Sequence, residues 1–251
     1  MKFPRHKLYI DIKFLIISLF NLLLKKEKIS KKYNNLKKSF EHYYNSKNIY
    51  FISTWRLGLY FILKSYNLAK SSEIIITGIG IPDKINSVLL ADLKPVFVDL
   101  DLNSHNIDIS DLKKKINHNT KVVHITYLSG LVPNMNKIKE ICNENDLILI
   151  EDISQAYGAN YKNKICGTFG NVSIGSFSLG KTISSNGGGV VIINDDKIKK
   201  NFENLFDSEL TLPSKLFLIK LNLNQILIKI LTSKLIFNFF TYYLFFLIKK
   251  I

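Results

Sequence analysis

The feature that most constrains the fold is an alternation of apolar runs with segments of helical period between residues 53 and 152. The apolar runs have the length of strands and read EIIITG, KPVFVDLD, TKVVHITY and LILIED. Between them, segments such as IPDKINSVLLADL and NMNKIKEICNEN repeat apolar residues at helical spacing. This order predicts a mainly parallel sheet with helices on both faces, and ligands of such sheets gather at the carboxyl ends of strands. Asp99, Tyr127 and Asp152 fall at such ends.

The stretch GSFSLGKT, residues 175 to 182, matches the phosphate-binding pattern G-x-x-x-x-G-K-[ST] of nucleotide hydrolases. That pattern binds phosphate where a strand leads into it and a helix begins inside it. Here the segment KTISSNGGG runs directly into the apolar run VVIIND, and three consecutive glycines disfavour a helix. The acidic strand end LILIED also precedes the motif instead of following it. The sequence therefore predicts a loop at Lys181, and we interpret the match as a coincidence.

Lys181 and Asp152 suit a different chemistry. A lysine amine forms a Schiff base with the aldehyde of pyridoxal phosphate, and a carboxylate against the ring nitrogen keeps that ring protonated as an electron sink. Lys181 ends a strand segment beside a Gly-rich turn, and Asp152 ends another strand. The alternative is structural: Asp152 caps a helix, and Lys181 is a solvated turn residue.

A set of short motifs occurs in a fixed order within EDISQAYGANYKNKICGTFGNVSIGSFSLGKTISSNGGGVVIIND. It contains acid-Asp-x-x-Gln, Gly-x-x-Gly, Ser-Phe-x-x-x-Lys and Gly-Gly before a strand. Together with LKPVFVDLDLNSHNID and TKVVHITYLSGLVPNMNKIKEIC upstream, these motifs resemble the DegT/DnrJ/EryC1/StrS family of sugar aminotransferases over roughly residues 45 to 196. The resemblance implies an α/β fold, the aspartate aminotransferase-type large domain of pyridoxal-phosphate-dependent transferases with a mainly parallel sheet, here with apolar helical flanks.

The resemblance also implies roles for individual residues. Lys181 would hold pyridoxal phosphate and shuttle the proton during transamination, and Asp152 would pair with the pyridinium nitrogen. Gln155 would contact the ring or its phenolic oxygen, and Ser176 would bind the phosphate. As the structural alternative, Gln155 and Ser176 are ordinary polar loop residues.

The phosphate loop of the family falls on TWRLGL, so Trp55 and Arg56 open the helix whose N-terminus would face the phosphate. Trp55 stands where the family usually has Gly, and its side chain is expected either to crowd the phosphate or to turn outward. A role for Arg56 in phosphate binding and a purely solvated Arg56 are equally compatible with the sequence. The aromatic ring that often stacks on the cofactor is expected near Ile79 to Ile81, a stretch that has none.

Both ends of the chain combine basic and apolar residues, as in KFLIISLFNLLLKK and LIFNFFTYYLFFLIKK, and the formal net charge is +15. Each uninterrupted run is shorter than the ~20 residues that a spanning helix needs, so an interfacial helix or a helix docked on the domain is expected. Asp11, Lys13 and the lack of an A-x-A-like site argue against a secretory signal. We predict peripheral attachment to the cytoplasmic leaflet through residues 216–251, helped by residues 8–28, and no binding of nucleic acid.

Three segments are predicted: a basic, partly apolar helical segment at 1–50, the α/β domain at 51–207, and an apolar, basic helical tail at 208–251. In the family, a small C-terminal domain that shapes the sugar site follows the α/β domain, and here the tail replaces it. Cys142 and Cys166 form no metal-ligand pattern with the histidines and are expected as reduced thiols, so no metal site is predicted.

Three functions are compatible with this organisation. The first is a cytoplasmic aminotransferase that moves an amino group from glutamate to a nucleotide-linked keto sugar, for surface polysaccharide or amino-sugar biosynthesis. The second is a truncated or degenerate member with little turnover, and the third is a non-catalytic interaction protein at a membrane surface. Lys181 favours the first two over the dehydratase branch of the family, which has His at that position. The resemblance also implies a homodimer.

Overall fold

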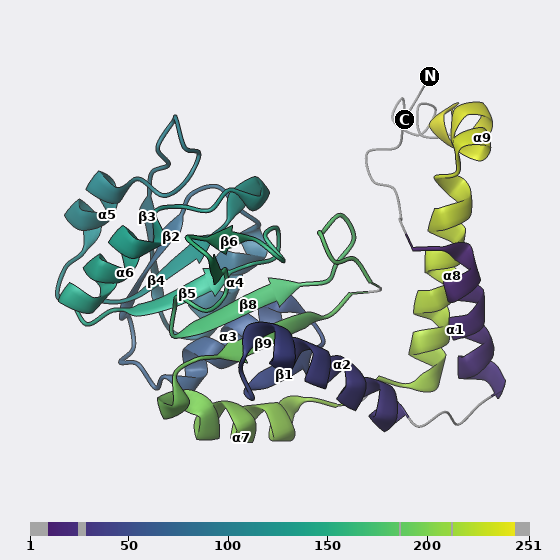
Figure 1. Cartoon of the computed structure of the whole chain (residues 1–251), viewed down its shortest axis with the longest axis horizontal. Helices are drawn as coiled ribbons and strands as arrows, with labels where there is room; N and C mark the ends of the chain where they lie inside the picture. Colours follow the sequence, from purple (N-terminus) through teal and green to yellow (C-terminus); the bar gives the residue numbers. More distant parts are fainter. Residues whose placement is uncertain (1–9, 25–28, 186, 212, 244–251) are drawn as a thin grey trace.

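The computed structural model describes residues 10–24, 29–185, 187–211 and 213–243 (Figure 1). Its centre is a seven-stranded sheet in the order β1-β9-β8-β5-β4-β2-β3. The strands are β1 (Ile49–Ile52), β2 (Glu73–Thr77), β3 (Lys94–Val98), β4 (Thr120–Thr126), β5 (Ile148–Asp152), β8 (Val172–Ser176) and β9 (Gly189–Ile193). From β3 to β8 neighbouring strands are parallel, whereas β9 is antiparallel to β8 and β1. The predicted α/β fold with a mainly parallel sheet is confirmed.

Helices cover both faces of the sheet, as predicted. One face carries α2 (Ile29–Tyr44), α5 (Ile109–Lys115) and α6 (Met135–Glu144), and the other carries α3 (Trp55–Ser65), α4 (Pro82–Leu90) and α7 (Lys199–Glu209). Successive residues of a strand point to opposite faces, so Leu149 belongs to the first apolar core and Ile150 to the second. Shorter elements connect these parts: β6 (Asn160–Tyr161), β7 (Lys164–Ile165), η1 (Leu128–Gly130) and η2 (Asp196–Ile198).

Close backbone contacts place the N-terminus of α3 beside the carboxyl end of β8. Thr54 caps α3, because its hydroxyl accepts the Leu57 N–H at 3.2 Å. A Cβ on Gly189 would lie 2.7 Å from the Gly175 carbonyl oxygen and 3.5 Å from the Trp55 nitrogen. Only glycine therefore fits where β9 passes between β8 and the start of α3.

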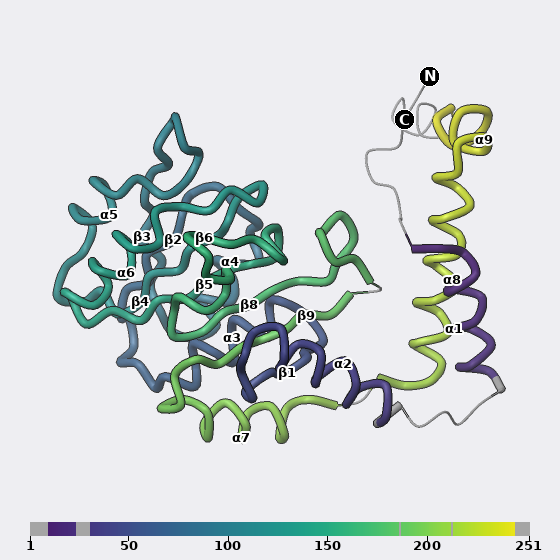
Figure 2. Tube along the Cα trace, in the orientation of Figure 1, coloured from purple at the N-terminus to yellow at the C-terminus, as the bar shows by residue number. Residues whose placement is uncertain are grey.

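Two helices from opposite ends of the described chain form an arm beside the α/β domain (Figures 1 and 2). α1 (Ile12–Leu24) packs along α8 (Lys215–Leu231), which α9 (Lys234–Ile236) and η3 (Phe237–Thr241) continue. The Lys215 ammonium donates to the Leu23 carbonyl at 3.4 Å, so the start of α8 meets the end of α1 and the pair is antiparallel. We call α1, α8, α9 and η3 the helical arm. Of the predicted membrane-binding segments, residues 8–9, 25–28 and 244–251 lie outside the described residues.

The described residues contain one bent pair of helices, and no single helix, with the length and apolar character of a membrane-spanning segment. No single helix there has both the length and the apolar character to cross a bilayer. One pair of helices is long and apolar enough when the two are taken together, namely Lys215–Leu231 and Lys234–Thr241, and a bend of 63° separates them.

Candidate active site

Asp152 is the last residue of β5 and lies at the carboxyl end of the parallel strands. Its side chain is buried, and one carboxylate oxygen accepts the Ser154 N–H at 3.0 Å. Burial raises the pKa of Asp152, while the Ser154 hydrogen bonds and the positive charges of Lys181 and Lys84 lower it. Asp152 is therefore a buried carboxyl group with two lysines near enough to stabilise its charged form.

Glu151, the neighbouring acid, points to the opposite face of the sheet and is fully buried. Its carboxylate accepts the N–H groups of Gly167, Phe169 and Gly170 at 2.8, 2.7 and 2.6 Å, and the Tyr127 hydroxyl at 2.5 Å. Burial raises its pKa, and these donors oppose the rise. Glu151 thus fixes the loop before β8 and leaves Asp152 as the acid available to a ligand. This role of Glu151 was not predicted from the sequence.

Lys181 lies in the loop between β8 and β9, and no helix begins in the described residues of that loop. The Ser185 N–H donates to the Phe177 carbonyl at 2.7 Å and closes the base of the loop. The Lys181 N–H donates to the Ser178 carbonyl at 3.3 Å in a turn. The predicted loop is confirmed, so GSFSLGKT is not the phosphate loop of a nucleotide hydrolase. The partly exposed Lys181 side chain lies close enough to lower the pKa of Asp152.

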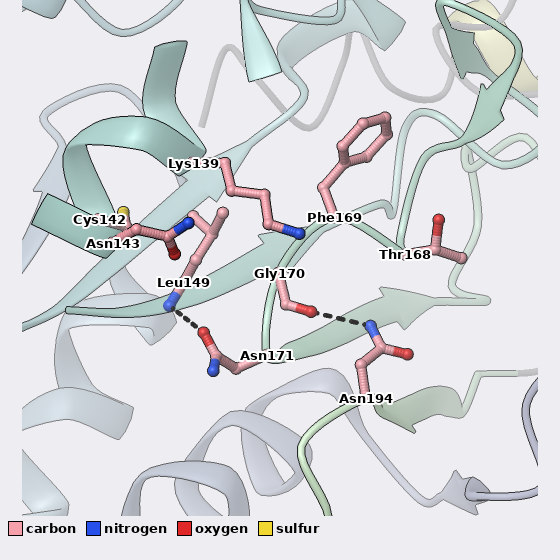
Figure 3. A pocket seen from close by; sticks show the side chains of 9 residues that line it. All are labelled: Lys139, Cys142, Asn143, Leu149, Thr168, Phe169, Gly170, Asn171 and Asn194. Carbon is pink, nitrogen blue, oxygen red and sulfur yellow. Dashed lines mark hydrogen bonds between the residues drawn. The ribbon is translucent and has the colours of Figure 1, made fainter. Parts of the chain in front are cut away.

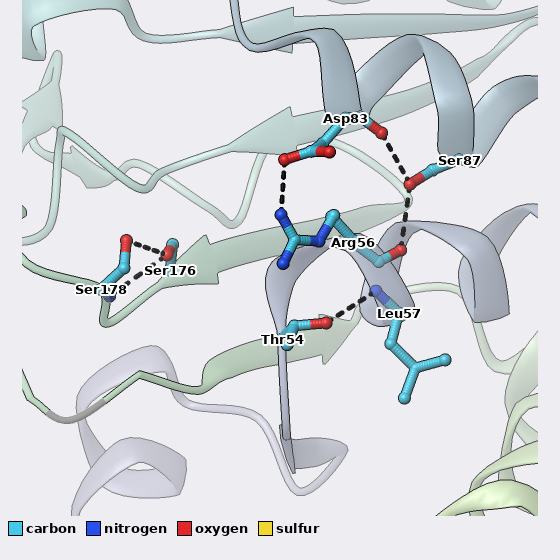
Figure 4. A network of polar contacts seen from close by, with 7 residues as sticks. All are labelled: Thr54, Arg56, Leu57, Asp83, Ser87, Ser176 and Ser178. Carbon is cyan, nitrogen blue, oxygen red and sulfur yellow. Dashed lines mark hydrogen bonds and ion pairs between the residues drawn. The ribbon is translucent and has the colours of Figure 1, made fainter. Parts of the chain in front are cut away.

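Ser176 ends β8 and forms a hydroxyl pair with Ser178, with 2.9 Å between the two oxygens (Figure 4). The Ser176 N–H donates to the Ser154 hydroxyl at 3.0 Å, which links the ends of β8 and β5. Figure 4 also shows the first turn of α3, where the Leu57 N–H donates a hydrogen bond to the Thr54 hydroxyl. Serine hydroxyls and the N-terminal amides of a helix together form a donor set suited to an anion.

Arg56 is engaged with α4. Its guanidinium pairs with the Asp83 carboxylate at 2.5 Å, and its carbonyl accepts the Ser87 hydroxyl at 3.2 Å (Figure 4). Both charged side chains are substantially exposed, so the pair contributes little to stability. Any contact between Arg56 and a phosphate remains a prediction, since Asp83 already neutralises the guanidinium.

Trp55 does not turn outward, which corrects one of the two expectations from its family position, while crowding of the phosphate stays a prediction. Its side chain is only 6% exposed and packs edge-on against His124 of β4, with ring centroids 5.9 Å apart. The indole therefore fills the core beneath the end of the sheet. Its main-chain nitrogen, in contrast, lies at the first turn of α3.

Gln155 reaches the loop after β4. Its side-chain oxygen accepts the Ser129 N–H at 2.9 Å, which ties the turn after β5 to η1. Ser129 has φ 54° and Gly130 has φ 79°, so two residues in left-handed conformations shape this loop. Contact between Gln155 and a cofactor ring stays a prediction.

Lys84 is a site-facing residue that the sequence analysis missed. It is 3% exposed, and its ammonium donates to the Thr77 carbonyl at 3.3 Å. Burial lowers its pKa, and the nearby charge of Asp152 opposes that change. The sequence contains a signal for this burial, because Lys84 lies four residues before Val88 and therefore on the same, buried side of α4.

A separate pocket of about 290 Å³ lies at the other end of the same strands (Figure 3). Leu149 and Asn171, which belong to the start of β5 and the residue before β8, line it and share a 2.9 Å hydrogen bond. Asn194 closes another side by donating to the Gly170 carbonyl at 3.0 Å. None of the residues predicted for the active site lines this pocket.

Comparison with known proteins decides the family. The sequence profile of the DegT/DnrJ/EryC1/StrS aminotransferase family matches residues 17–211. The chain belongs to this family. Curated relatives include a GDP-perosamine synthase of Escherichia coli O157:H7, 32% identical over 57% of this chain and 40% of its own length. Another is a GDP-4-keto-6-deoxy-D-mannose 3-dehydratase of E. coli O55:H7, 33% identical over 55% of this chain and 36% of its own length.

Solved structures of the family share the fold. Helicobacter pylori PseC, an aminotransferase involved in the biosynthesis of pseudoaminic acid, superposes with a TM-score of 0.73 at 23% identity, over 90% of this chain and 65% of that one. The E. coli GDP-4-keto-6-deoxy-D-mannose-3-dehydratase with bound hydrated PLP gives a TM-score of 0.71 at 21% identity, over 90% and 67%. This similarity confirms the expected pyridoxal-phosphate-dependent transferase fold. The chain spans about two fifths of the length of the curated relatives above.

Proposed function

We propose that the chain is a pyridoxal-phosphate-dependent aminotransferase that acts on a nucleotide-linked keto sugar, in surface polysaccharide or amino-sugar biosynthesis. One observation carries the proposal: Asp152 is buried at the carboxyl end of β5, and Ser154 links it to the end of β8, from which the loop with Lys181 continues. A lysine amine and a carboxylate are the two groups that this cofactor chemistry requires. Aminotransferase relatives of the same family, among them the GDP-perosamine synthase, support the choice of reaction.

The donor set of the site fits pyridoxal phosphate at both ends. Asp152 suits a protonated ring nitrogen, because it is buried at the carboxyl end of β5 and Ser154 is its hydrogen-bond partner. Ser176, Ser178 and the first amides of α3 suit the phosphate. A Cβ on Gly189 would lie 2.7 Å from the Gly175 carbonyl oxygen, so only glycine fits in β9 beside the first turn of α3.

When bound, pyridoxal phosphate supplies an aldehyde that condenses with amines and a ring that accepts electrons. In the proposed reaction the Lys181 amine would hold the cofactor and would carry the proton that moves during amino transfer. Asp152 keeps the ring nitrogen protonated, and Gln155 orients the ring from the η1 side. Ser176 and the start of α3, with Trp55 and Arg56, anchor the phosphate.

Further partners belong to the same proposal. The amino donor is glutamate, and the acceptor carries a nucleotide, as the names of the relatives suggest. We propose a homodimer that works in the cytoplasm, peripheral to the inner face of a membrane. The excess of basic residues in the two flanks, where the formal net charge of +15 is concentrated, supports this location.

The test is absorbance spectroscopy of purified protein with added pyridoxal phosphate. A visible band should form, and borohydride should abolish it while fixing the cofactor mass to the peptide that contains Lys181. Lys181→Ala should lack both signals, whereas Lys70→Ala, a change at an exposed lysine, should keep them. Amino transfer is then measured with glutamate and GDP-4-keto-6-deoxy-D-mannose, the compound in the name of one relative.

Two outcomes would contradict the proposal. If the wild-type chain takes up no cofactor, the non-catalytic alternative replaces it. If cofactor binds through Lys181 but no nucleotide-linked keto sugar is aminated, the binding assignment stands and the reaction assignment fails.

A further inference from the structure

The helical arm has its polarity reversed relative to a helix pair in water. The two buried residues of α8 are both amides, Asn222 and Gln225, which are 1% and 5% exposed. Four of its six leucines and its phenylalanine are exposed, whereas Leu218 and Leu221 are half-buried. Most apolar residues of α1 are exposed too, apart from the buried Leu15 and the half-buried Leu19 and Leu22. The outward residues more than half exposed are Phe14, Ile16, Ile17, Phe20, Leu23, Leu216, Phe217, Leu227, Leu235, Phe239, Phe240 and Tyr243. Helices in water place apolar residues inside and polar residues outside.

The buried amides are also incompletely bonded. Within the part of the chain that the structure describes, Asn222 Oδ1 and Gln225 Oε1 have no hydrogen-bond partner. In water such groups would gain by turning outward, where solvent satisfies them. In a hydrocarbon layer the preference reverses, and polar side chains face the interior of a helix pair.

The positive charge of the helical arm favours lipids with anionic headgroups. The described residues of the arm contain no Asp or Glu from 12 to 24 or from 215 to 243. Lys13, Lys215, Lys220 and Lys234 are exposed among the apolar side chains. Long lysine side chains keep their charge at the headgroup level while neighbouring apolar residues insert, and anionic headgroups attract them.

We propose that the outer face of the helical arm inserts into the acyl chains of an anionic membrane, with the Asn222 and Gln225 amides enclosed between α1 and α8. This rests on the proposed location at a membrane and names the surface that makes the contact. A second copy of the chain would need only one apolar stripe on the arm. Both helices instead expose apolar residues over a broad part of their surface, and only a few exposed polar residues, among them Lys13, Lys220 and Asn224, interrupt it.

The shape of the arm agrees with insertion from one side. The helix axis turns by 63° after Leu231, so α8 and its continuation do not form one straight span. Interfacial helices lie with their apolar faces in the upper acyl layer and do not need to cross the membrane.

The first experiment is flotation of the full chain with phosphatidylcholine vesicles, with and without phosphatidylglycerol. Binding should occur with phosphatidylglycerol and fall by roughly tenfold or more in the double variant Phe20→Gln, Leu227→Gln, because two large apolar side chains lose their burial. The matched control is Leu90→Gln, Leu102→Gln, which removes two exposed leucines of the α/β domain and should leave flotation unchanged. Neither cofactor nor sugar is added, so the result is independent of the proposed enzymatic reaction.

The second experiment separates lipid from a second copy. A polarity-sensitive fluorophore is attached at Phe20→Cys or Leu102→Cys in the full chain, whose Cys142 and Cys166 are both buried. Anionic vesicles should shift the emission of the label at position 20 to shorter wavelength and leave that at position 102 unchanged. Self-association would give a different result. The label at position 20 would then report an apolar environment without vesicles, and dilution of the protein would shift its emission to longer wavelength. Absence of flotation, or equal loss in both double variants, would also overturn the proposal.

Discussion

The imidazole of His124 lies edge-on against the indole of Trp55, with an angle of 88° between the ring planes. Both imidazole nitrogens and the indole N–H are buried without a hydrogen-bond partner among the described residues. Each such group costs about 1–3 kcal/mol. Burial and the charge of Lys84 lower the pKa of His124 to about 3. This pair therefore reduces stability beneath the candidate active site, and it does so most at acid pH.

The substitution His124→Leu should stabilise the chain. It replaces a buried imidazole that lacks partners with an apolar side chain of similar size, and a gain of about 1–3 kcal/mol in the free energy of unfolding is expected. His124 binds its proton more weakly in the folded chain than in the unfolded one. Wild-type stability should therefore fall as the pH drops from 6.5 towards about 3, and the variant should lose less over that window. Urea unfolding across that window tests this, with exposed His42→Leu as the control. A variant less stable than the wild type would contradict it.

The substitution Glu151→Ala should destabilise the α/β domain by about 3–5 kcal/mol. Three main-chain N–H groups and the Tyr127 hydroxyl would lose their acceptor inside the core. Thermal unfolding measures the loss, and the exposed pair member Glu140→Ala serves as the control. An equal, small effect of both variants would refute the structural role given to Glu151.

The substitution Ser176→Ala should weaken cofactor binding by about tenfold, because a hydrogen bond to a charged phosphate contributes about 1.5–3 kcal/mol. Its hydroxyl partner Ser178 remains in the variant and explains why binding is weakened and not abolished. Titration of the visible band with pyridoxal phosphate gives the affinity. Ser208→Ala, a change in α7, is the control. Unchanged affinity would remove Ser176 from the phosphate site.

The substitution Lys84→Met should move the acid limit of cofactor uptake to higher pH. Burial raises the pKa of Asp152, and removal of a nearby positive charge raises it further, so the carboxylate that must face the ring nitrogen becomes protonated sooner as the pH falls. The visible band followed against pH measures the shift. Lys70→Met, at an exposed lysine, should leave the limit unchanged. If Lys84→Met instead weakens cofactor uptake equally at every pH, the role of Lys84 is purely structural.

The sequence predicted those parts of the fold that depend on local pattern. Strand β5 and helix α6 follow from apolar spacing, and the loop at Lys181 follows from three adjacent glycines. The direction of Trp55 could not be predicted, because it depends on His124, which reaches it through the tertiary fold. Glu151 and Asp152 point to opposite faces because side chains alternate along a strand. The partners of Glu151 could not be predicted, because they are loop amides 16 to 19 residues away. Roles taken from the family motifs, such as those of Gln155 and Arg56, are still predictions.

The pairing of α1 with α8 also orders events during synthesis. The contact between Leu23 and Lys215 joins residues 192 positions apart. At the usual rate of translation, α1 leaves the ribosome roughly 10 to 40 s before its partner exists. During that interval its phenylalanines and leucines meet only solvent, chaperones or a bilayer, so the nascent chain can reach a membrane before the sheet has closed. The order of α1 and α8 along the chain thus makes their pairing a kinetic matter, because α1 is synthesised well before its partner helix.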